Sequence, residues 1–253
     1  MIKVCGVSFA YGKAEILKNI SLEFGKGKLY AIVGPNGCGK TTLIKLLSGL
    51  NKPKAGSLTL DGQPYGNLKR KDFAKQVALL PQGRNIPNMS VYDFVACGRF
   101  PHLGATRRLT AEDEASINAA LKSTGTEMFA EKSLKKLSGG ERQRVYIAML
   151  LAQNSPYLLL DEPTTHLDIS AKFDILSLMC NIKQNGKCVI AVLHDLELAL
   201  KYSDEIILML DGEVLSKASP CETVKSGLLA DAFKVNCKAV ELDGETRYFF
   251  NNL

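Results

Sequence analysis

One segment near the start of the chain has the residue types and spacing of a phosphate-binding loop. Residues 34–42 read GPNGCGKTT, which matches the pattern G-x-x-x-x-G-K-[ST]. Glycines let the backbone turn tightly enough to aim several N–H groups at one anion, and Lys40 can reach the β and γ phosphates of a nucleotide. The hydroxyl of Thr41 suits a bound Mg²⁺. The predicted nucleotide-binding residues are Gly34, Pro35, Asn36, Gly37, Cys38, Gly39, Lys40, Thr41 and Thr42.

The segments on either side of this loop predict a strand before it and a helix after it. Residues 29–33 are apolar, and Leu43, Leu46, Leu47 and Leu50 follow the spacing of one helix face. A helix that begins within the loop adds its positive end to a phosphate site. Strand, glycine-rich loop and helix is the order in which this pattern binds phosphate.

Two adjacent carboxylates follow a second apolar run. Residues 157–160 are typical of a buried parallel strand, and Asp161 and Glu162 come directly after them. Open α/β sheets bind ligands at the carboxyl ends of their strands, so we expect this pair beside the phosphate loop. Asp161 suits a Mg²⁺ ligand, and Glu162 suits a general base for an attacking water.

A third motif, LSGGERQ, occupies residues 137–143. Ser138 and the two glycines after it precede a helical pattern, and a serine N-cap followed by glycines leaves backbone N–H groups at the positive end of a helix. This is a second anion site, far in sequence from the first. One nucleotide has one γ-phosphate, so two such surfaces on one chain suggest that two chains share each nucleotide.

These three motifs, in this order, closely resemble the ATP-binding subunits of ABC transporters. The match comprises GPNGCGKTT, LSGGERQ and LLLDEPTTHLD, with about 100 residues from the first to the second. The resemblance implies an α/β fold of the P-loop NTPase type, with a mixed sheet, an antiparallel β layer and a helical lobe. It also implies a head-to-tail dimer in which one subunit closes on the ATP and Mg²⁺ held by Lys40 of the other. The closing residues are Ser138, Gly139, Gly140 and Gln143.

Four further positions match the family one at a time. Gln82 matches the glutamine that contacts Mg²⁺ and water, and His194 matches the histidine that donates to the γ-phosphate. Asp168 matches the aspartate that bridges the two subunits. Tyr11 matches the aromatic residue that stacks on adenine, although Phe9 is a second aromatic candidate nearby.

The composition excludes several classes of protein. With 253 residues, 46% of them hydrophobic and 23% charged, the chain is expected to be globular rather than disordered or collagen-like. No apolar run reaches the roughly 18 residues needed to span a bilayer, and no secretory signal is visible, so a cytosolic location is expected. The net charge of +6 suits an anionic ligand, a phospholipid surface or simple solubility, and it does not indicate nucleic acid.

The cysteines and histidines do not form a predicted metal site. Seven cysteines without a CxxC pair read as reduced thiols, and the three histidines lack mutual spacing. Cys38 lies near a helix start, so we expect a lowered thiol pKa, inhibition by alkylation and protection by ATP. His102 and His166 are expected in surface loops without a chemical role.

The chain is expected to form one ABC ATPase domain over residues 1–253. Its predicted parts are a nucleotide-binding core (1–83 and 154–215), a helical lobe (84–153) and a strand-rich C-terminal tail (216–253). Residues 29–33, 157–160, 188–193 and 205–210 are predicted to form a parallel sheet. Predicted hairpin turns are Gly12-Lys13, Asp61-Gly62, Asp211-Gly212 and Asp243-Gly244.

Two stretches narrow the resemblance. Residues 88–102 and 165–169 look like the subfamily that serves iron-siderophore, haem and cobalamin import. The resemblance implies a separate integral-membrane permease, touched by the segment 98–102, and an extracytoplasmic substrate-binding protein that selects the cargo. It places the chain at the cytoplasmic face of the membrane. One departure is Met149, where the family usually has an arginine that makes a supporting ion pair.

A different class remains open. A soluble ABC ATPase of a cofactor or iron-sulfur assembly complex has a similar size. ABC ATPases that act on nucleic acid or ribosomes carry coiled-coil insertions or tandem units, and neither is visible in this sequence. Co-purification with a polytopic membrane protein would separate the importer from the assembly complex.

Overall fold

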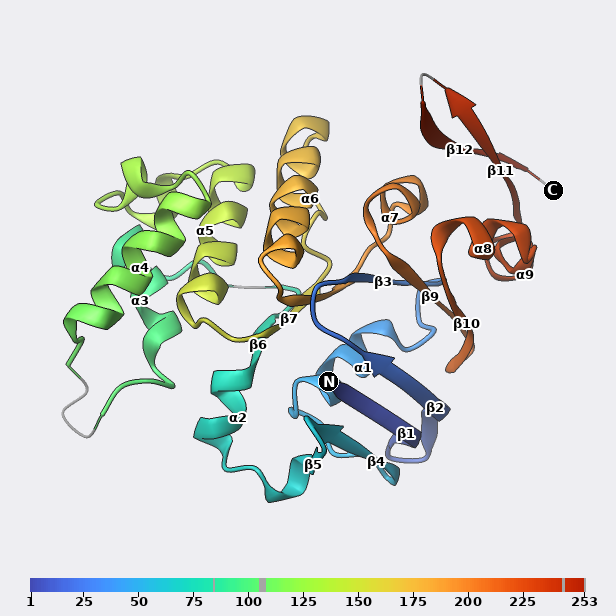
Figure 1. The fold of residues 1–253 in the computed structure, drawn as a ribbon, viewed down its shortest axis with the longest axis horizontal. Coiled ribbons are helices and arrows are strands. Elements are labelled where there is room, and N and C mark those ends of the chain that lie inside the picture. The colour runs from blue at the N-terminus through green and yellow to red at the C-terminus, as the bar shows by residue number, and fades with distance from the viewer. Residues whose placement is uncertain (84, 105–107, 243, 253) are drawn as a thin grey trace.

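The computed structural model describes residues 1–83, 85–104, 108–242 and 244–252. In that part of the chain, the centre is a six-stranded sheet with strand order β10-β9-β3-β8-β7-β6 (Figure 1). Neighbouring strands are parallel except for the pair β9 and β10. The strands are β3 (Leu29–Val33), β6 (Val77–Leu80), β7 (Tyr157–Asp161), β8 (Cys188–Val192), β9 (Glu205–Leu210) and β10 (Glu213–Ala218).

The four predicted parallel strands are confirmed, but the sequence did not predict β6. The turn Asp211-Gly212 also joins β9 to β10 as expected, with Leu210 opposite Glu213. β6 is only four residues long and follows the helix α2 (Arg70–Gln76) without a break. A short apolar run next to a helix cannot be told from a further helical turn by its periodicity.

Both faces of the central sheet are covered, which explains the continuous apolar runs of its strands. Tyr30 and Ile32 of β3 pack into a cluster with α1 (Lys40–Leu47) and the antiparallel sheet described below. Ala31 and Val33 point to the other face and pack with α5, α6 and α7. These helices are α5 (Gly139–Ala152), α6 (Ile169–Gln184) and α7 (Leu196–Tyr202).

A second, antiparallel sheet has the order β2-β1-β4-β5. Two-residue turns close its hairpins as predicted, since Tyr11 lies opposite Ala14 and Leu60 lies opposite Gln63. Both turns use left-handed glycines, which carry no Cβ penalty there. The strands are β1 (Ile2–Tyr11), β2 (Ala14–Phe24), β4 (Ala55–Leu60) and β5 (Gln63–Pro64).

The helix after the phosphate loop is shorter than the leucine spacing predicts. α1 ends at Leu47, and Leu43, Leu46 and Leu47 are buried. Leu50 is 67% exposed and lies beyond the helix, so its assignment to the buried face was wrong. Gly49 lies two residues after the end of α1 and adopts the left-handed conformation. The helix therefore ends before it reaches Leu50.

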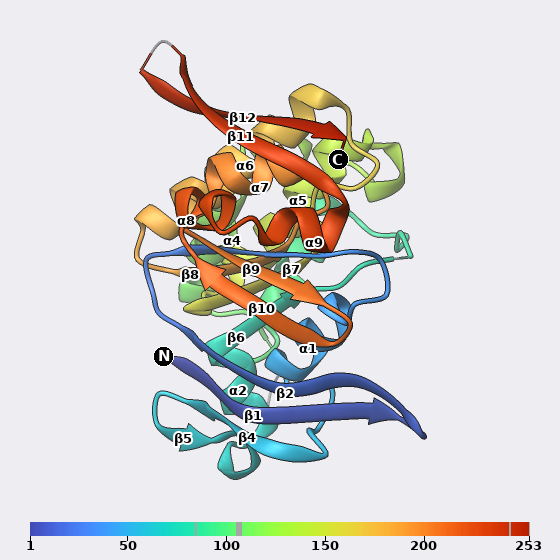
Figure 2. The same ribbon diagram turned by 90° about the vertical axis from the view of Figure 1, so that its right-hand side faces the viewer.

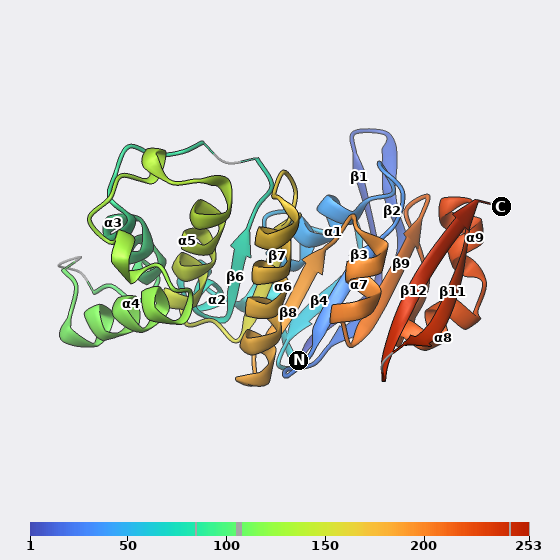
Figure 3. The same ribbon diagram turned by 90° about the horizontal axis from the view of Figure 1, so that it is seen from above.

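The segment between β6 and β7 is mainly helical and lies at one end of the molecule (Figure 3). α3 (Val91–Ala96) and α4 (Ala111–Ser123) pack against α5 around buried Val95, Ile117 and Val145. Among the described helices, none combines the length and apolar character that a membrane-spanning segment needs.

Single 3₁₀ turns complete the helical elements of the described chain: η1 (Tyr65–Asn67), η2 (Cys97–Arg99), η3 (Glu127–Phe129) and η4 (Leu134–Lys136).

The segment expected to touch a permease turns its arginine inward. Arg99 Nε lies 2.8 Å from Asp113 Oδ1, and its guanidinium also donates to the carbonyl of Ala152 at 2.8 Å. Bonds from Thr110 and Arg99 hold the pKa of Asp113 at about 2. The Arg99 side chain is therefore not available to a partner. Phe100 beside it is 65% exposed and remains accessible.

The two histidines left without a chemical role differ in their surroundings. His102 lies in a turn after η2, as expected, but it is half-buried, and its Nε2 lies 2.8 Å from the carbonyl oxygen of Gln153. His166 is exposed in the loop after β7, as expected, with a left-handed φ of 62°.

The C-terminal segment contains two helices that the strand-rich prediction missed. Ser219 and Glu222 form a capping box with Pro220 at the first helical position, a signal that the sequence already carried. A final hairpin packs on α7 through β12 and projects from the molecule (Figures 1 and 2). The predicted turn of this hairpin is Asp243-Gly244, of which Asp243 lies outside the described residues. The elements are α8 (Pro220–Lys225), α9 (Leu228–Phe233), β11 (Val235–Leu242) and β12 (Glu245–Asn252).

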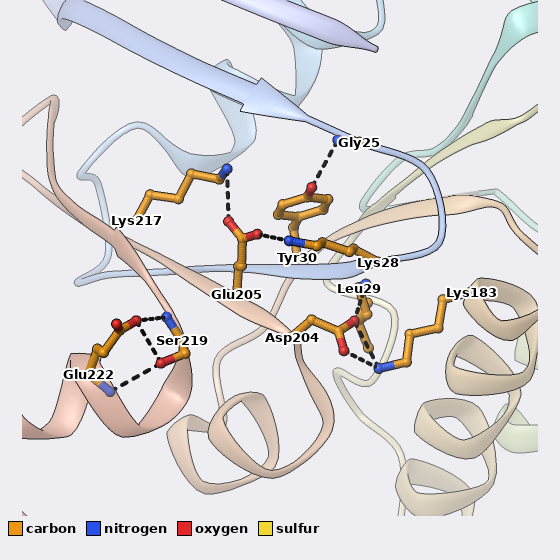
Figure 4. A network of polar contacts seen from close by, with 10 residues as sticks. All are labelled: Gly25, Lys28, Leu29, Tyr30, Lys183, Asp204, Glu205, Lys217, Ser219 and Glu222. Carbon is orange, nitrogen blue, oxygen red and sulfur yellow. Dashed lines mark hydrogen bonds and ion pairs between the residues drawn. The ribbon is translucent and has the colours of Figure 1, made fainter.

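A polar network fixes the amino ends of the central strands (Figure 4). The backbone N–H of Leu29 donates to Asp204, which also accepts from Lys183 of α6 at 2.7 Å. Next to it, Glu205 accepts from Lys28 and Lys217. The starts of β3 and β9 are thereby anchored, while the opposite ends of the strands are left for the candidate site.

Candidate functional site

The phosphate loop lies between the end of β3 at Val33 and the start of α1 at Lys40. Gly39 has a φ of 105°, and a Cβ at this position would lie 2.6 Å from the side chain of Leu17. Only glycine fits this conformation and this approach. The Lys40 ammonium is buried inside the loop and donates to the carbonyls of Gly34 and Pro35, both at 2.8 Å.

The loop and the end of β7 bring together two oxygen ligands suited to a metal. Thr41 Oγ1 donates to Asp161 Oδ1 at 3.2 Å. Burial raises the pKa of Asp161, the Thr41 hydroxyl opposes this, and the charge of Glu162 adds to it. A hydroxyl and a carboxylate oxygen form a donor set that fits Mg²⁺, which takes oxygen ligands.

The Glu162 carboxylate receives donors from three sides. His194 Nε2 lies 2.5 Å from Oε1, while Gln82 Nε2 lies 2.6 Å from Oε2 and Thr165 Oγ1 lies 3.2 Å from Oε2. Gln82, Glu162 and His194 follow β6, β7 and β8, which are neighbours in the sheet and run in the same direction. Their carboxyl ends therefore meet at one edge.

A cavity of about 260 Å³ opens between the phosphate loop and this carboxylate. Ile16 of β2 also lines it, and no motif had pointed to this aliphatic residue. Tyr11 does not line the cavity. It is 50% exposed, its hydroxyl accepts from Asn51 at 3.0 Å, and its ring packs edge-on against Phe9. The lining residues are Ile16, Asn36, Gly37, Gly39, Lys40, Thr41, Thr42, Glu162 and His194.

Other predicted residues form a separate group at the starts of α5 and α6. Ser138 caps α5 and forms a capping box with Glu141, as its position before the helix suggested. Asp168 caps α6 by accepting from the Ala171 N–H at 2.8 Å. A Cβ added to Gly140 would lie 2.9 Å from Ala171 Cβ, so the two helix starts are in contact. Also in this part of α5 are Gly139, in its first turn, and Gln143, which is buried.

The expected lowered pKa of the Cys38 thiol was wrong. The thiol is only 4% exposed, and burial raises its pKa, although the nearby Lys40 charge opposes the shift. The short loop turns Cys38 towards the interior, so desolvation outweighs the helix end and the lysine.

At pH 7, we expect iodoacetamide to label the exposed Cys5 and Cys221 well before Cys38. A raised thiol pKa leaves less thiolate at neutral pH. Labelling of Cys38 should therefore accelerate as the pH rises above 9.0, the ordinary pKa of a cysteine thiol. Time-resolved peptide mass spectrometry measures the three rates, with the unfolded chain as the control. Labelling of Cys38 as fast as that of Cys221 in the folded chain would contradict this.

Residues 17–165, which hold the loop, the carboxylates and the helix start at Ser138, match the family model described as ABC transporter. The chain belongs to the ABC transporter family. The ABC relatives include the probable siderophore transport system ATP-binding protein YusV of Bacillus subtilis (strain 168). It is 37% identical over 93% of this chain and 86% of its own length.

Two further comparisons bear on this ABC protein. The ferric enterobactin transport ATP-binding protein FepC of Escherichia coli (strain K12) is 38% identical over 93% of this chain and 88% of its own length. The dimeric structure of MJ0796, a bacterial ABC transporter cassette, has a TM-score of 0.75 at 30% identity. It covers 87% of this chain and 99% of MJ0796. The predicted P-loop NTPase fold class is thereby confirmed.

As an ABC ATPase, the chain binds nucleotide and hydrolyses ATP. ATPases of this family function with membrane permease subunits, and their cassettes dimerise. The importer interpretation is supported over an assembly-complex ATPase, because the relatives over almost the whole chain are import or transport ATP-binding proteins. Thr165 also contacts Glu162, and the motif matches assigned its hydroxyl no role.

Proposed function

We propose that this chain powers an importer of iron-siderophore complexes or related metal chelates. The observation that carries the proposal is whole-chain similarity to proteins named for siderophore, ferric enterobactin and iron(3+)-hydroxamate import, at 37–38% identity over 92–93% of the chain. Cargo is selected by the permease subunits and an extracytoplasmic substrate-binding protein. The chain works as a peripheral subunit at the cytoplasmic face of the membrane and does not act on nucleic acid.

In this proposal the phosphate loop, residues 34–42, holds the phosphates of ATP. Thr41, Asp161 and Gln82 hold Mg²⁺, which when bound neutralises charge on the β and γ phosphates. The 3.2 Å contact between Thr41 and Asp161 supports the first two ligands. Tyr11 stacks on adenine through its ring, which is 50% exposed and does not line the cavity.

Glu162 accepts a proton from the attacking water, while His194 donates to the γ-phosphate. A base must sit within hydrogen-bonding reach of water beside the phosphates. Glu162 and His194 both line the 260 Å³ cavity that the phosphate loop also lines, which supports these roles. Gln82 links the carboxylate to β6 through its bond to Glu162 Oε2.

The second group of residues completes the site of another subunit. Ser138, Gly139, Gly140, Gln143 and Asp168 do not line the cavity, and they gather around the adjoining starts of α5 and α6. A head-to-tail homodimer brings them onto the ATP held by a second copy. Helix N-termini favour phosphate, which supports this arrangement. The nucleotide core comprises residues 1–83 and 154–215, with a helical lobe at 84–153 and a tail at 216–253.

Gene deletion in the source organism tests the proposal. Loss of the chain should abolish uptake of at least one radioactive ferric siderophore under iron limitation, and the wild-type gene should restore it. The Lys40→Ala variant should not restore uptake. In detergent extracts, the tagged chain should elute with a polytopic membrane protein. Unchanged uptake of all ferric siderophores, or elution with soluble cofactor-assembly proteins alone, would overturn the proposal.

A further inference from the structure

The loop that joins the catalytic carboxylate to α6 is short and conformationally constrained. It begins at Glu162, which has a left-handed φ of 54°, and it contains His166 with a φ of 62°. Non-glycine residues adopt this conformation at a cost of roughly 1 kcal/mol or more, so the surrounding contacts must hold it in place. At the far end of the loop, Asp168 is fixed as the cap of α6.

Thr165 closes the turn at the start of this loop. Its backbone N–H donates to the Glu162 carbonyl at 3.4 Å, and its hydroxyl donates to Glu162 Oε2 at 3.2 Å. The backbone and the side chain of one residue therefore both fix Glu162. Because the two residues are only three apart in one turn, this hydroxyl stays beside the carboxylate without any long-range packing.

The other two donors to the carboxylate come from different elements. Gln82 follows β6 and His194 follows β8, and both have proposed contacts with Mg²⁺ or the γ-phosphate. When Gln82 and His194 make those contacts, they are no longer committed only to the Glu162 carboxylate. Thr165 is the one of these three described donors that belongs to the same turn as Glu162 and has no assignment at the nucleotide.

We propose that Thr165 is a positioning residue, whose hydroxyl orients the Glu162 carboxylate towards the attacking water. The inference rests on the proposed role of Glu162 as general base. Donation to Oε2 restricts rotation of the carboxylate and leaves Oε1 on the side of His194, which lines the nucleotide cavity. Thr165 does not itself touch the reacting atoms. Its effect is on the fraction of the ATP-bound enzyme with a correctly aimed base.

Replacement of Thr165 by valine keeps the shape of the side chain and removes the hydroxyl. We expect kcat for ATP hydrolysis by the full chain, alone and in its membrane complex, to fall roughly tenfold. The KM for ATP should stay within about twofold, because the phosphate loop is untouched. Thr165→Ser restores a hydroxyl at the same carbon and should recover at least half of wild-type kcat.

A matched control removes a comparable hydroxyl elsewhere. Thr223 is fully buried, and its Oγ1 donates to the Ser219 carbonyl at 2.9 Å. Thr223→Val should lower the melting temperature, because the Ser219 carbonyl loses this donor, and it should leave kcat near that of the wild type. A Thr165→Val enzyme with wild-type kcat, a serine variant as slow as the valine variant, or a loss confined to KM would each overturn the inference.

The Glu162→Gln variant separates this inference from the proposed function. Loss of turnover in Glu162→Gln together with normal turnover in Thr165→Val means that only the positioning role fails. Normal turnover in Glu162→Gln means that the proposed base fails, and the positioning role fails with it. In single-turnover measurements, Thr165→Val should cause no further loss once Glu162 is glutamine, and a further tenfold loss would show that Thr165 acts by another route.

Discussion

Glu162→Gln is expected to lower ATP turnover by about 10²–10⁴-fold while ATP binding is retained. The amide has nearly the same shape as the carboxylate and cannot accept a proton from water at neutral pH. Lys40, Thr41 and Asp161 remain to hold the nucleotide and its cation. The blocked enzyme should accumulate as an ATP-bound dimer, because hydrolysis no longer separates the subunits.

Steady-state phosphate release and light scattering with size-exclusion chromatography measure these two effects. Glu213→Gln is the matched control, since Glu213 is exposed and lies 3.9 Å from Lys18, away from the cavity. That variant should have normal turnover and no trapped dimer. Normal turnover in Glu162→Gln would eliminate Glu162 as the base.

Lys40→Ala is expected to weaken ATP binding itself. The ammonium is buried within the phosphate loop, where hydrogen bonds to charged groups contribute about 1.5–3 kcal/mol each. Net loss of one such bond corresponds to a roughly 10- to 100-fold higher Kd for ATP. Isothermal titration calorimetry of the full chain measures the Kd. Hydrolysis should fall in parallel, because the γ-phosphate loses the positive charge of the Lys40 ammonium.

Lys54→Ala provides the control for the change in charge. Lys54 is exposed, and its Nζ donates to the Gly12 carbonyl at 2.8 Å outside the cavity. It should bind ATP as the wild type does. An unchanged Kd in Lys40→Ala, with a melting temperature close to that of Lys54→Ala, would count against the phosphate-loop assignment.

Local patterns predicted the parts of the site that depend on neighbouring residues. Glycine spacing and a following helix are enough to predict the loop around Lys40, because the geometry is set within one turn of chain. An apolar run that ends in Asp161 and Glu162 similarly predicts carboxylates at a sheet edge. Their position beside Thr41 then follows from the parallel direction of the strands.

Features that depend on tertiary packing were not predictable in this way. The inward turn of Arg99 depends on a carboxylate supplied by α4, and the buried state of Cys38 depends on a core cluster whose members, such as Met209 of β9, are distant in sequence. β6 was missed because four apolar residues carry no periodicity of their own. Thr165 lies within the matched motif LLLDEPTTHLD, but the motif gave its hydroxyl no role, because that role depends on contact with the Glu162 side chain.

The order of strands in the central sheet has a consequence for biosynthesis. β6 pairs with β7 across a separation of 80 residues, Val77 with Tyr157, and β8 adds its pairing only later in the chain. Contacts between residues so far apart in sequence form slowly. The chain loses the conformational entropy of the intervening loop before the strand pairing stabilises it. β3, which leads into the phosphate loop, lies between β8 and β9, so the loop also gains its sheet support late in synthesis. The carboxylate and its histidine likewise meet only after β8 has left the ribosome. We therefore expect ATP hydrolysis only from a chain whose synthesis has passed β9.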